Sequence, residues 1–334
     1  MSILFYPLRW LWLLLPPDSA TSLVQVLHLA IGAASTTWLL RTFRCSAVSS
    51  AAGGVAFALS GTCLDLIVHS CYIVSAAWIP LAWAAARSVQ QGLAVAGIQS
   101  RRVPMILKAL ALATACLGLL FGGDPQGFGL VAAIVLFESA VQLPSALRGA
   151  RGSARPNSLS LALLGSLVTC VVVASSFAIA LFQGLGSLDE LSLGFRGAGM
   201  SADEVLSWSL SRDYWAGLIL PGWSSSPVDP GVTARSLWFE PRHPNHFDLI
   251  EWNRVPYLGA LALAAIIPSA TVRRARGPLA IFLVGLAFAF GRDGLVLPKL
   301  LDWIPAVGTF RYPAKYMLVT TLAAVVISVI VIDR

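Results

Sequence analysis

The longest polar stretch of this 334-residue chain runs from Gln183 to Trp252. It opens with QGLGSLDELSLGFRG (183–197) and ends with WFEPRHPNHFDLIEW (238–252). Nine acidic residues, four arginines and five of the eleven tryptophans lie within it. The hydrocarbon core of a bilayer disfavours this many charges. The stretch therefore decides the fold, because it must lie outside a membrane that the apolar segments on either side of it can cross.

Apolar segments of helix length make up most of the remaining chain. The sequence is 57% hydrophobic and 12% charged, whereas a soluble domain is about one-quarter charged. Several segments approach the roughly 20 residues that cross about 30 Å of hydrocarbon, and a helix satisfies its backbone groups within the segment. These features predict an all-α polytopic membrane protein. The net charge is +7, and the basic residues behind it are scattered at the ends of the predicted helices. This distribution indicates membrane orientation and argues against a nucleic-acid partner.

Hydropathy predicts nine spans in a three-part chain. Residues 1–182 carry six spans, residues 183–252 form an outer-face loop with an interfacial helix, and residues 253–334 carry three spans. The eighth span is short and can extend to Leu297. The predicted spans are Ser22–Leu40, Val48–Cys63, Tyr72–Ala86, Val103–Phe121, Phe128–Leu143, Ser158–Phe182, Val255–Val272, Leu279–Phe290 and Tyr312–Ile332.

The basic residues assign the loops to the two sides of the membrane. One set of alternating loops holds thirteen cations against two acids, Glu138 and Asp333, and the other set holds ten cations and fourteen acids. The positive-inside rule places the first set, and the C-terminus, in the cytoplasm. Nine spans then place Met1 outside, which predicts a further helix upstream, and the abrupt end at Arg334 predicts a longer C-terminal part. The thirteen cations are Arg41, Arg44, Arg87, Arg101, Arg102, Lys108, Arg148, Arg151, Arg155, Arg273, Arg274, Arg276 and Arg334.

Three segments on the outer side have the character of membrane interfaces. Residues 1–17 are apolar and aromatic but contain Pro7 and Arg9, which favours an interfacial segment over a span. The sequence SADE (201–204) reads as a capping box that opens an amphipathic helix reaching Leu210. Leu295 to Ile304 is predicted to form a second interfacial helix.

A polar turn, GGDPQ (122–126), joins the fourth and fifth predicted spans. Its glycines permit a tight turn, Pro125 suits the first position of a helix, and Asp124 would lie at the helix N-terminus. One interpretation is a capped structural hairpin. The other is a catalytic carboxylate, Asp124, and a substrate-binding amide, Gln126, that face an outer cavity.

The sequence FRYPAK (310–315) leads into the last predicted span. Arg311 and Lys315, one helical turn apart, would clamp a phosphate with a bidentate grip and a point charge, and Tyr312 lies between them. The alternative is that both cations extend to lipid headgroups. Their place on the side that the positive-inside rule disfavours supports a specific use.

Two further pairs of ionisable residues are candidates for the same site. Asp65 and His69 lie four residues apart between two spans and would share a helical face, either as functional groups or as a structural pair. Glu190 and Arg196 open the large loop, as a substrate-site acid and cation or as an ordinary solvated pair.

The sequence gives little support for metal or nucleotide chemistry. His243 and His246 form an HxxH pattern in a proline-rich loop, which lacks the helical context of a zinc site. The chain has no GK[ST] phosphate loop, no HExxH and no GxSxG. We therefore expect no metal site and no cytoplasmic ATP hydrolysis, and the need for a divalent cation is left open.

Seven short motifs, in order, resemble the bacterial YfhO-type membrane proteins, relatives of the C-type (GT-C) glycosyltransferases. The resemblance covers nearly the whole chain, and the order and spacing of the motifs make it moderately specific. The family often carries histidine where this chain has Asp124. The motifs are FYP (5–7), FALSG (57–61), AWIPL (77–81), GGDPQ (122–126), WSL (208–210) with LPG (220–222), YLG (257–259) and FRYPAK (310–315).

The resemblance implies a GT-C-like bundle in the bacterial inner membrane that uses a polyprenyl-phosphate-linked sugar. The acceptor would be a glycan or lipid of the cell envelope on the outer, periplasmic face. Such enzymes place a catalytic acid in the first outer loop, which would precede Met1, so this chain alone is expected to be inactive. The remaining carboxylates for a base are Asp124, Asp65 and Glu190.

The substrate-binding residues that follow from this hypothesis are Arg311, Lys315, Arg196, Gln126, His69 and Tyr312. Two other classes of protein remain as alternatives. A transporter or lipid flippase would carry ionisable residues at mid-span and paired broken helices, whereas the charges here gather at the ends of the spans. A non-catalytic scaffold subunit would tolerate the loss of the outer carboxylates.

Overall fold

The computed structural model describes residues 6–68, 72–95, 102–152, 157–184, 202–207, 209, 210, 218, 258–304, 307 and 312–334. All regular structure in these ranges is helical, with no strand, so the predicted all-α class is confirmed for them. The chain divides into two compact units. Unit 1 consists of Met1–Leu59, Ile67–Ser187 and Val329–Arg334, and unit 2 consists of Ser60–Leu66 and Leu188–Ser328.

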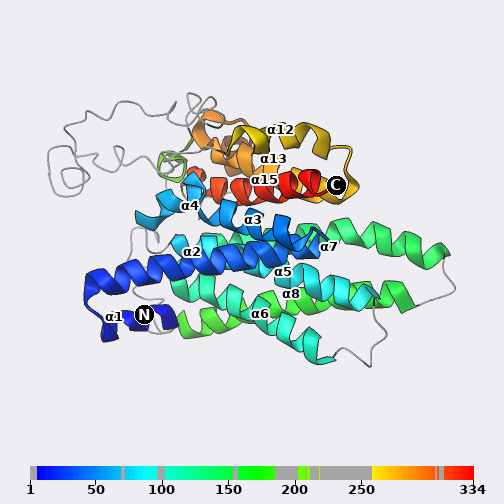
Figure 1. Ribbon diagram of the computed structural model, residues 1–334, viewed down its shortest axis with the longest axis horizontal. Helices are drawn as coiled ribbons and strands as arrows, with labels where there is room; N and C mark the ends of the chain where they lie inside the picture. The colour runs from blue at the N-terminus through cyan, green and yellow to red at the C-terminus, as the bar shows by residue number, and fades with distance from the viewer. Residues whose placement is uncertain are drawn as a thin grey trace. The chain divides into compact units, whose positions relative to one another are not determined.

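Unit 1 is built from long helices that lie side by side (Figure 1). A short N-terminal segment, η2 and α1, precedes them. The elements are η2 (Pro7–Trp10), α1 (Leu11–Leu14), α2 (Pro17–Thr42), α3 (Ala47–Ala58), α5 (Ile73–Val95), α6 (Arg102–Gly122), α7 (Pro125–Gly152) and α8 (Asn157–Gly184).

Unit 2 contains shorter helices and most of the last long helix. Its core includes Leu210, Leu218, Ala289, Phe290 and Met317. The elements are α4 (Gly61–Asp65), α10 (Ala202–Val205), α12 (Ala260–Ser269), η7 (Arg273–Ala275), α13 (Arg276–Ala289), η8 (Gly291–Asp293), α14 (Val296–Trp303), η10 (Pro313–Lys315) and α15 (Tyr316–Ile332), whose last residues belong to unit 1.

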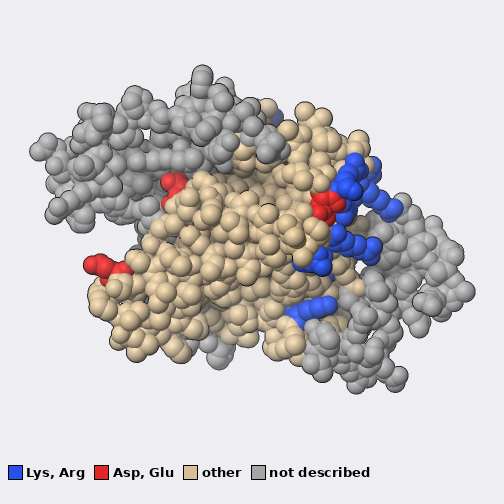
Figure 2. Space-filling view, viewed as in Figure 1, with Lys and Arg blue, Asp and Glu red and all other residues tan. Residues whose placement is uncertain are grey.

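Three helical segments are long and apolar enough to cross a membrane: Pro17–Thr42, Met105–Gly122 and Pro313–Ile332. On one face of the molecule, most of the described surface carries neither basic nor acidic side chains (Figure 2). These features indicate a membrane protein, as the composition predicts. The count of nine spans stays a prediction.

Several predicted spans have different boundaries in the structure: α5 and α7, for example, each continue nine residues beyond the predicted ends Ala86 and Leu143. Two further differences have local causes. The predicted span Val48–Cys63 is interrupted after Ala58, because the Ser60 side chain accepts a hydrogen bond from the Cys63 N–H and caps a new helix, α4. The predicted extension of the eighth span to Leu297 is wrong, because α13 ends at Ala289 and Gly291 adopts a left-handed φ of 38°.

The predicted amphipathic helix that begins at SADE is shorter than expected. Helix α10 ends at Val205, and the Leu210 N–H donates to the Ala289 carbonyl at 2.8 Å. A tertiary hydrogen bond therefore takes the place of a further helical turn. The second predicted helix is confirmed as α14, where Leu297 is buried and Trp303 is 81% exposed, and its place at the membrane interface stays a prediction.

Helix α5 is the centre of unit 1, because it contacts α2, α6, α7 and α8. Its polar contacts set the directions of its neighbours. Lys108 of α6 donates to the Ser88 carbonyl of α5, and an added Cβ at Gly122, the other end of α6, would meet the Val74 side chain, so α6 runs antiparallel to α5. Near the opposite ends of α5, Ser75 and Arg87 contact α7, which runs parallel to α5.

This arrangement gives unit 1 two chemically different ends. We name the end that holds Tyr6, Ser75 and Asp124 the Asp124 end, and the end that holds Arg87 and Glu138 the Arg87 end. Side chains that follow alternate predicted spans lie at the same end, as expected for loops on one side of a membrane.

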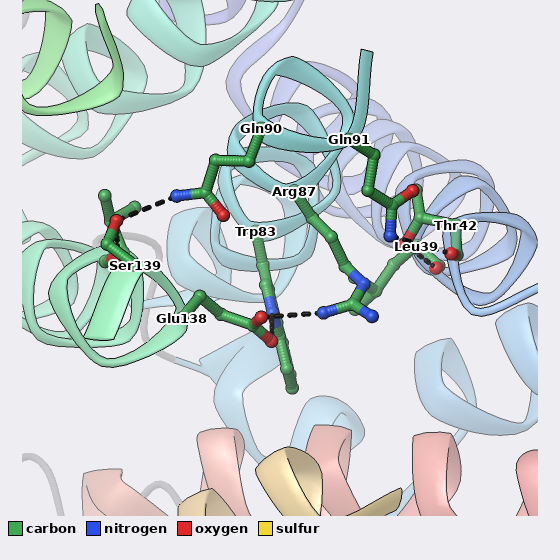
Figure 3. Close-up of polar contacts among 9 residues, drawn as sticks. Leu39, Thr42, Trp83, Arg87, Gln90, Gln91, Glu138 and Ser139 are labelled. Carbon is green, nitrogen blue, oxygen red and sulfur yellow. Dashed lines mark hydrogen bonds and ion pairs between the residues drawn. The ribbon is translucent and has the colours of Figure 1, made fainter. Parts of the chain in front are cut away.

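A buried polar cluster joins α5 to α7 at the Arg87 end (Figure 3). The Arg87 guanidinium donates to Glu138 Oε2 at 2.6 Å, and Trp83 Nε1 donates to Glu138 Oε1 at 3.0 Å. Arg87 also lies 3.8 Å from the centre of the Phe43 ring. The side chains of Arg87 and Glu138 are 16% and 4% exposed. Each buried charge therefore depends on the other for compensation.

We expect Arg87→Met to lower the free energy of unfolding by about 3–5 kcal/mol, because it leaves the buried Glu138 carboxylate without its cation. The double variant Arg87→Met/Glu138→Leu should regain much of this loss. Unfolding by titration with a denaturing detergent measures both. The matched control is Arg292→Met in unit 2, which removes an exposed ion pair with Asp203 and should cost about 0–1 kcal/mol. Equal costs for the two arginines would contradict a structural role for the buried pair.

Candidate functional site

Asp124 occupies the turn between α6 and α7 at the Asp124 end of unit 1. Gly123 has a left-handed φ of 94°, and Pro125 begins α7, as the sequence predicts. Asp124 Oδ1 accepts from the Gly127 N–H at 3.1 Å, which confirms the predicted cap. Oδ2 accepts from the Ser75 hydroxyl at 2.5 Å. The carboxylate is only 3% exposed, so these donors and the N-terminus of α7 stabilise its charge inside the protein.

Gln126 lies in the first turn of α7, two residues after Asp124. Its side chain is 6% exposed, and its Nε2 has no hydrogen-bond partner in the part of the chain that the structure describes. A buried amide donor without a partner costs free energy, and such groups are rare in folded proteins. Gln126 is therefore a candidate for contact with a bound group.

A directed chain of hydrogen bonds lies at the same end, between Trp78 of α5, Tyr6 and His28 of α2. Trp78 Nε1 donates to the Tyr6 hydroxyl at 2.7 Å, and that hydroxyl lies 2.5 Å from His28 Nε2. The Val24 carbonyl, 2.6 Å from His28 Nδ1, can only accept, so Nδ1 carries a proton. In the neutral ring, Nε2 then accepts the Tyr6 proton, and each polar atom has a partner.

Arg9 connects the N-terminal segment to the Asp124 turn. Its Nη2 donates to the Gly122 carbonyl at 3.0 Å, and its guanidinium lies 5.9 Å from the centre of the Trp12 ring. Tyr6 and Arg9 thus hold the segment at two points. Two residues that precede α2 therefore contact this end of unit 1: Tyr6 binds Trp78, and Arg9 binds the turn that holds Asp124.

Three other predicted site residues lie in unit 2. Tyr312 is buried and has a left-handed φ of 69°, which is unfavourable for a bulky residue and is often found at functional sites. The Lys315 ammonium lies 5.7 Å from the centre of the Tyr312 ring, close enough for a cation–π contact. Asp65 ends α4 and is half-buried.

The remaining predicted site residues, His69, Glu190, Arg196 and Arg311, lie outside the described residues. The structure therefore tests neither the Asp65–His69 pair nor the phosphate clamp of Arg311. Within the described ranges, no three His, Cys, Asp or Glu side chains come together as metal ligands.

Sequence reasoning missed Ser75, His28 and Arg9 as members of the site. Ser75 and His28 lie inside apolar helices. A single polar side chain in such a helix is common for structural reasons, so it does not mark a functional site. The available signal for Arg9 was its predicted place on the side of the membrane that the positive-inside rule disfavours.

No family model, curated protein or solved structure matches this chain. The resemblance to YfhO-type proteins therefore rests on the sequence motifs alone.

Burial raises the pKa of Tyr6 well above its ordinary value of 10.0, and the Trp78 hydrogen bond and the Arg9 charge offset this only in part. The folded protein keeps a proton that the unfolded chain releases near pH 10. The resulting stabilisation is complete below that pH and is lost as the pH rises above it. We therefore expect the free energy of unfolding to fall more steeply between pH 9 and 11 in the wild type than in Tyr6→Phe.

Chemical unfolding at each pH, in detergent, checks this expectation. At neutral pH Tyr6→Phe should cost about 1–3 kcal/mol, because Trp78 and His28 lose their shared partner. Parallel pH curves for the two proteins would show that Tyr6 titrates equally in the folded and unfolded chains.

Proposed function

We propose that this chain is a membrane glycosyltransferase-like protein that transfers a sugar from a polyprenyl-phosphate donor to an acceptor on the outer face. One observation carries the proposal. Three of the motifs that suggest the YfhO-type family meet at one end of unit 1. Trp78 donates a hydrogen bond to Tyr6, and Arg9 and Ser75 bind the turn that holds Gly122 and Asp124. Motifs separated by more than a hundred residues would have no reason to meet if each were only a local turn.

Asp124 is the candidate base of the reaction. The Ser75 hydroxyl and the Gly127 N–H donate to its carboxylate and hold it in place. In the proposed reaction, Asp124 accepts the proton of the acceptor hydroxyl while the hydroxyl oxygen bonds to the anomeric carbon of the sugar. The bond from that carbon to the phosphate oxygen breaks, and the polyprenyl phosphate leaves with the electron pair. Asp65 and Glu190 are the other candidate carboxylates.

Cations must stabilise the departing phosphate. Lys315 is the described candidate, and Arg311 and Arg196 are the others, with Tyr312, His69 and Gln126 as further substrate contacts. The acceptor would be a glycan or lipid of the bacterial cell envelope, and no metal is assigned a role.

The distribution of charge in unit 1 supports an outward-facing Asp124 end. The described cations Arg41, Arg44, Arg87 and Lys108 belong to the Arg87 end, since they follow or adjoin the last turns of α2 and α5 or the start of α6. The positive-inside rule then assigns that end to the cytoplasm. The large loop and the acceptor would be periplasmic, in the inner membrane.

A specific observation keeps the transporter or flippase as a second candidate. His28 is fully buried within α2, and the Arg87–Glu138 pair is buried between α5 and α7. Ionisable groups inside spanning helices are typical of transport pathways. A scaffold subunit would need none of these groups for its activity.

Sugar transfer from polyprenyl-phosphate-sugars in membranes, measured with the full-length reading frame, tests the proposal. We expect Asp124→Asn to lower transfer by about 10²–10⁴-fold, because the amide cannot accept the proton. Asparagine still caps a helix, so the fold should hold. The matched control is Asp18→Asn, an exposed carboxylate in the first turn of α2, which should leave transfer unchanged.

Two results would count against the proposal. Near-wild-type transfer by Asp124→Asn would remove Asp124 as the base. No transfer by the wild type from any donor tried would favour transport, which a lipid-scrambling assay in vesicles would then detect.

A further inference from the structure

We propose that Arg9 and Gln126 form a binding site for a phosphate group at the Asp124 end of unit 1. The inference rests on the proposed function and deepens it, since the donor carries a phosphate. The cations assigned to that phosphate above, Arg311, Lys315 and Arg196, lie in the sequence range of unit 2. Arg9 and Gln126 both belong to unit 1.

The first observation is the way in which Arg9 is held. A guanidinium has five N–H donors in a planar fork, and the Gly122 carbonyl takes one of them. That carbonyl is neutral, so it orients the guanidinium without compensating its charge. Arg87 shows the contrast, because its charge is compensated by Glu138 at 2.6 Å. An oriented guanidinium with donors to spare matches the oxygens of a phosphate better than a flexible ammonium does.

The second observation is the unpartnered amide of Gln126. The carbonyl that Arg9 contacts and the Gln126 side chain belong to the same five-residue turn. Gln126 is 94% buried, since only 6% of it is exposed, and its Nε2 lacks a partner among the described atoms. It also lies in the first turn of a 28-residue helix, where the helix dipole favours an anion. A ligand oxygen would satisfy this donor.

The carboxylate of Asp124 does not prevent an anion from binding nearby. Its two oxygens accept from the Ser75 hydroxyl and the Gly127 N–H, so its charge is already partly compensated on the α5 and α7 sides. Arg9 adds a positive charge on the side of Gly122.

The surroundings of Arg9 indicate that the phosphate belongs to a lipid. The N-terminal segment exposes Trp10, Leu13 and Leu14, which are 52%, 80% and 77% exposed. Tryptophan and leucine surfaces of this kind occupy the membrane interface, at the depth of lipid phosphates. The phosphate can come from the polyprenyl donor or from a phospholipid headgroup.

The test measures binding to the purified full chain in maltoside micelles, which contain no phosphate. The probes are farnesyl phosphate, phosphatidylglycerol and inorganic phosphate, and thermophoresis gives the dissociation constants. We expect Arg9→Gln to weaken farnesyl phosphate binding by about tenfold or more, because a charge-assisted pair is lost. Gln126→Leu should weaken it several-fold without lowering the melting temperature, since the amide nitrogen has no described partner to lose.

Arg41→Gln is the matched control. Arg41 also donates to a backbone carbonyl, that of Cys45, but at the Arg87 end, so its loss should not change binding. If phosphatidylglycerol binds as tightly as farnesyl phosphate, the phosphate comes from a phospholipid. If farnesyl phosphate binds far more tightly, it comes from the polyprenyl donor. Competition by inorganic phosphate would confirm that the phosphate itself is recognised.

Unchanged affinity in Arg9→Gln or in Gln126→Leu would overturn the site, and so would an equal loss in Arg41→Gln. If Arg9→Gln does not fold, Arg9→Lys takes its place, because lysine keeps the positive charge but lacks the planar set of guanidinium donors. Weaker phosphate binding by Arg9→Lys supports the site, and wild-type affinity overturns it. Arg9-dependent binding without sugar transfer would end the proposed function and leave the site standing. Sugar transfer without Arg9-dependent binding would end the proposed phosphate site and leave the proposed function standing.

Discussion

Helix α5 ties unit 1 together through polar side chains near both of its ends. At one end the Ser75 hydroxyl donates to Asp124, and at the other Trp83 and Arg87 donate to Glu138. Apolar packing against lipid-facing helices is non-directional, so it does not fix how far one helix slides along another. Two buried carboxylates, Asp124 directly before α7 and Glu138 within it, accept from donors on α5 and fix this register. A shift of one turn would leave both carboxylates buried without partners.

The same register gives the two ends of unit 1 different chemistry. The Arg87 end holds cations that follow alternate predicted spans, and a buried ion pair joins Arg87 to Glu138 there. The Asp124 end combines a buried carboxylate, an amide nitrogen with no partner among the described residues, and an arginine oriented by a carbonyl. This mixture of one acceptor and two donors is what an outer-face transferase needs to handle a hydroxyl and a phosphate side by side. The proposed function therefore follows from the position of α5 as much as from any single motif.

Features that depend on local sequence could be predicted, and features that depend on tertiary contacts could not. The fourth and sixth predicted spans differ from α6 and α8 by at most two residues at either end, and Asp124 caps α7 as expected. The end of α10 at Val205 escaped prediction, because Leu210 bonds to Ala289, which is distant in the sequence. The Ser60 cap that interrupts the second predicted span is a local signal, but it was outweighed by the continuous apolar run.

The candidate site shows the same division. Asp124 and Gln126 were identified from one short motif, whereas Ser75, His28 and Arg9 join the site only through contacts with residues 22 to 113 positions away in the sequence. A hydropathy pattern contains no information about which face of α2 or α5 meets the N-terminal segment. The direction of hydrogen bonding from Trp78 through Tyr6 to His28 likewise needs the positions of all three side chains.

The central claim is that the two ends of unit 1 face opposite sides of the membrane, with the Asp124 end outside. Cysteine accessibility tests it most directly, in a chain whose five native cysteines are replaced by serine or alanine. Asp18, in the first turn of α2, and Arg44, two residues after its last turn, are exposed and mark its two ends. We expect Asp18→Cys to react with a membrane-impermeant maleimide in cells whose outer membrane alone has been opened, and Arg44→Cys to react only after the inner membrane is permeabilised. Labelling of both from the same side, or in the reverse order, would contradict the account.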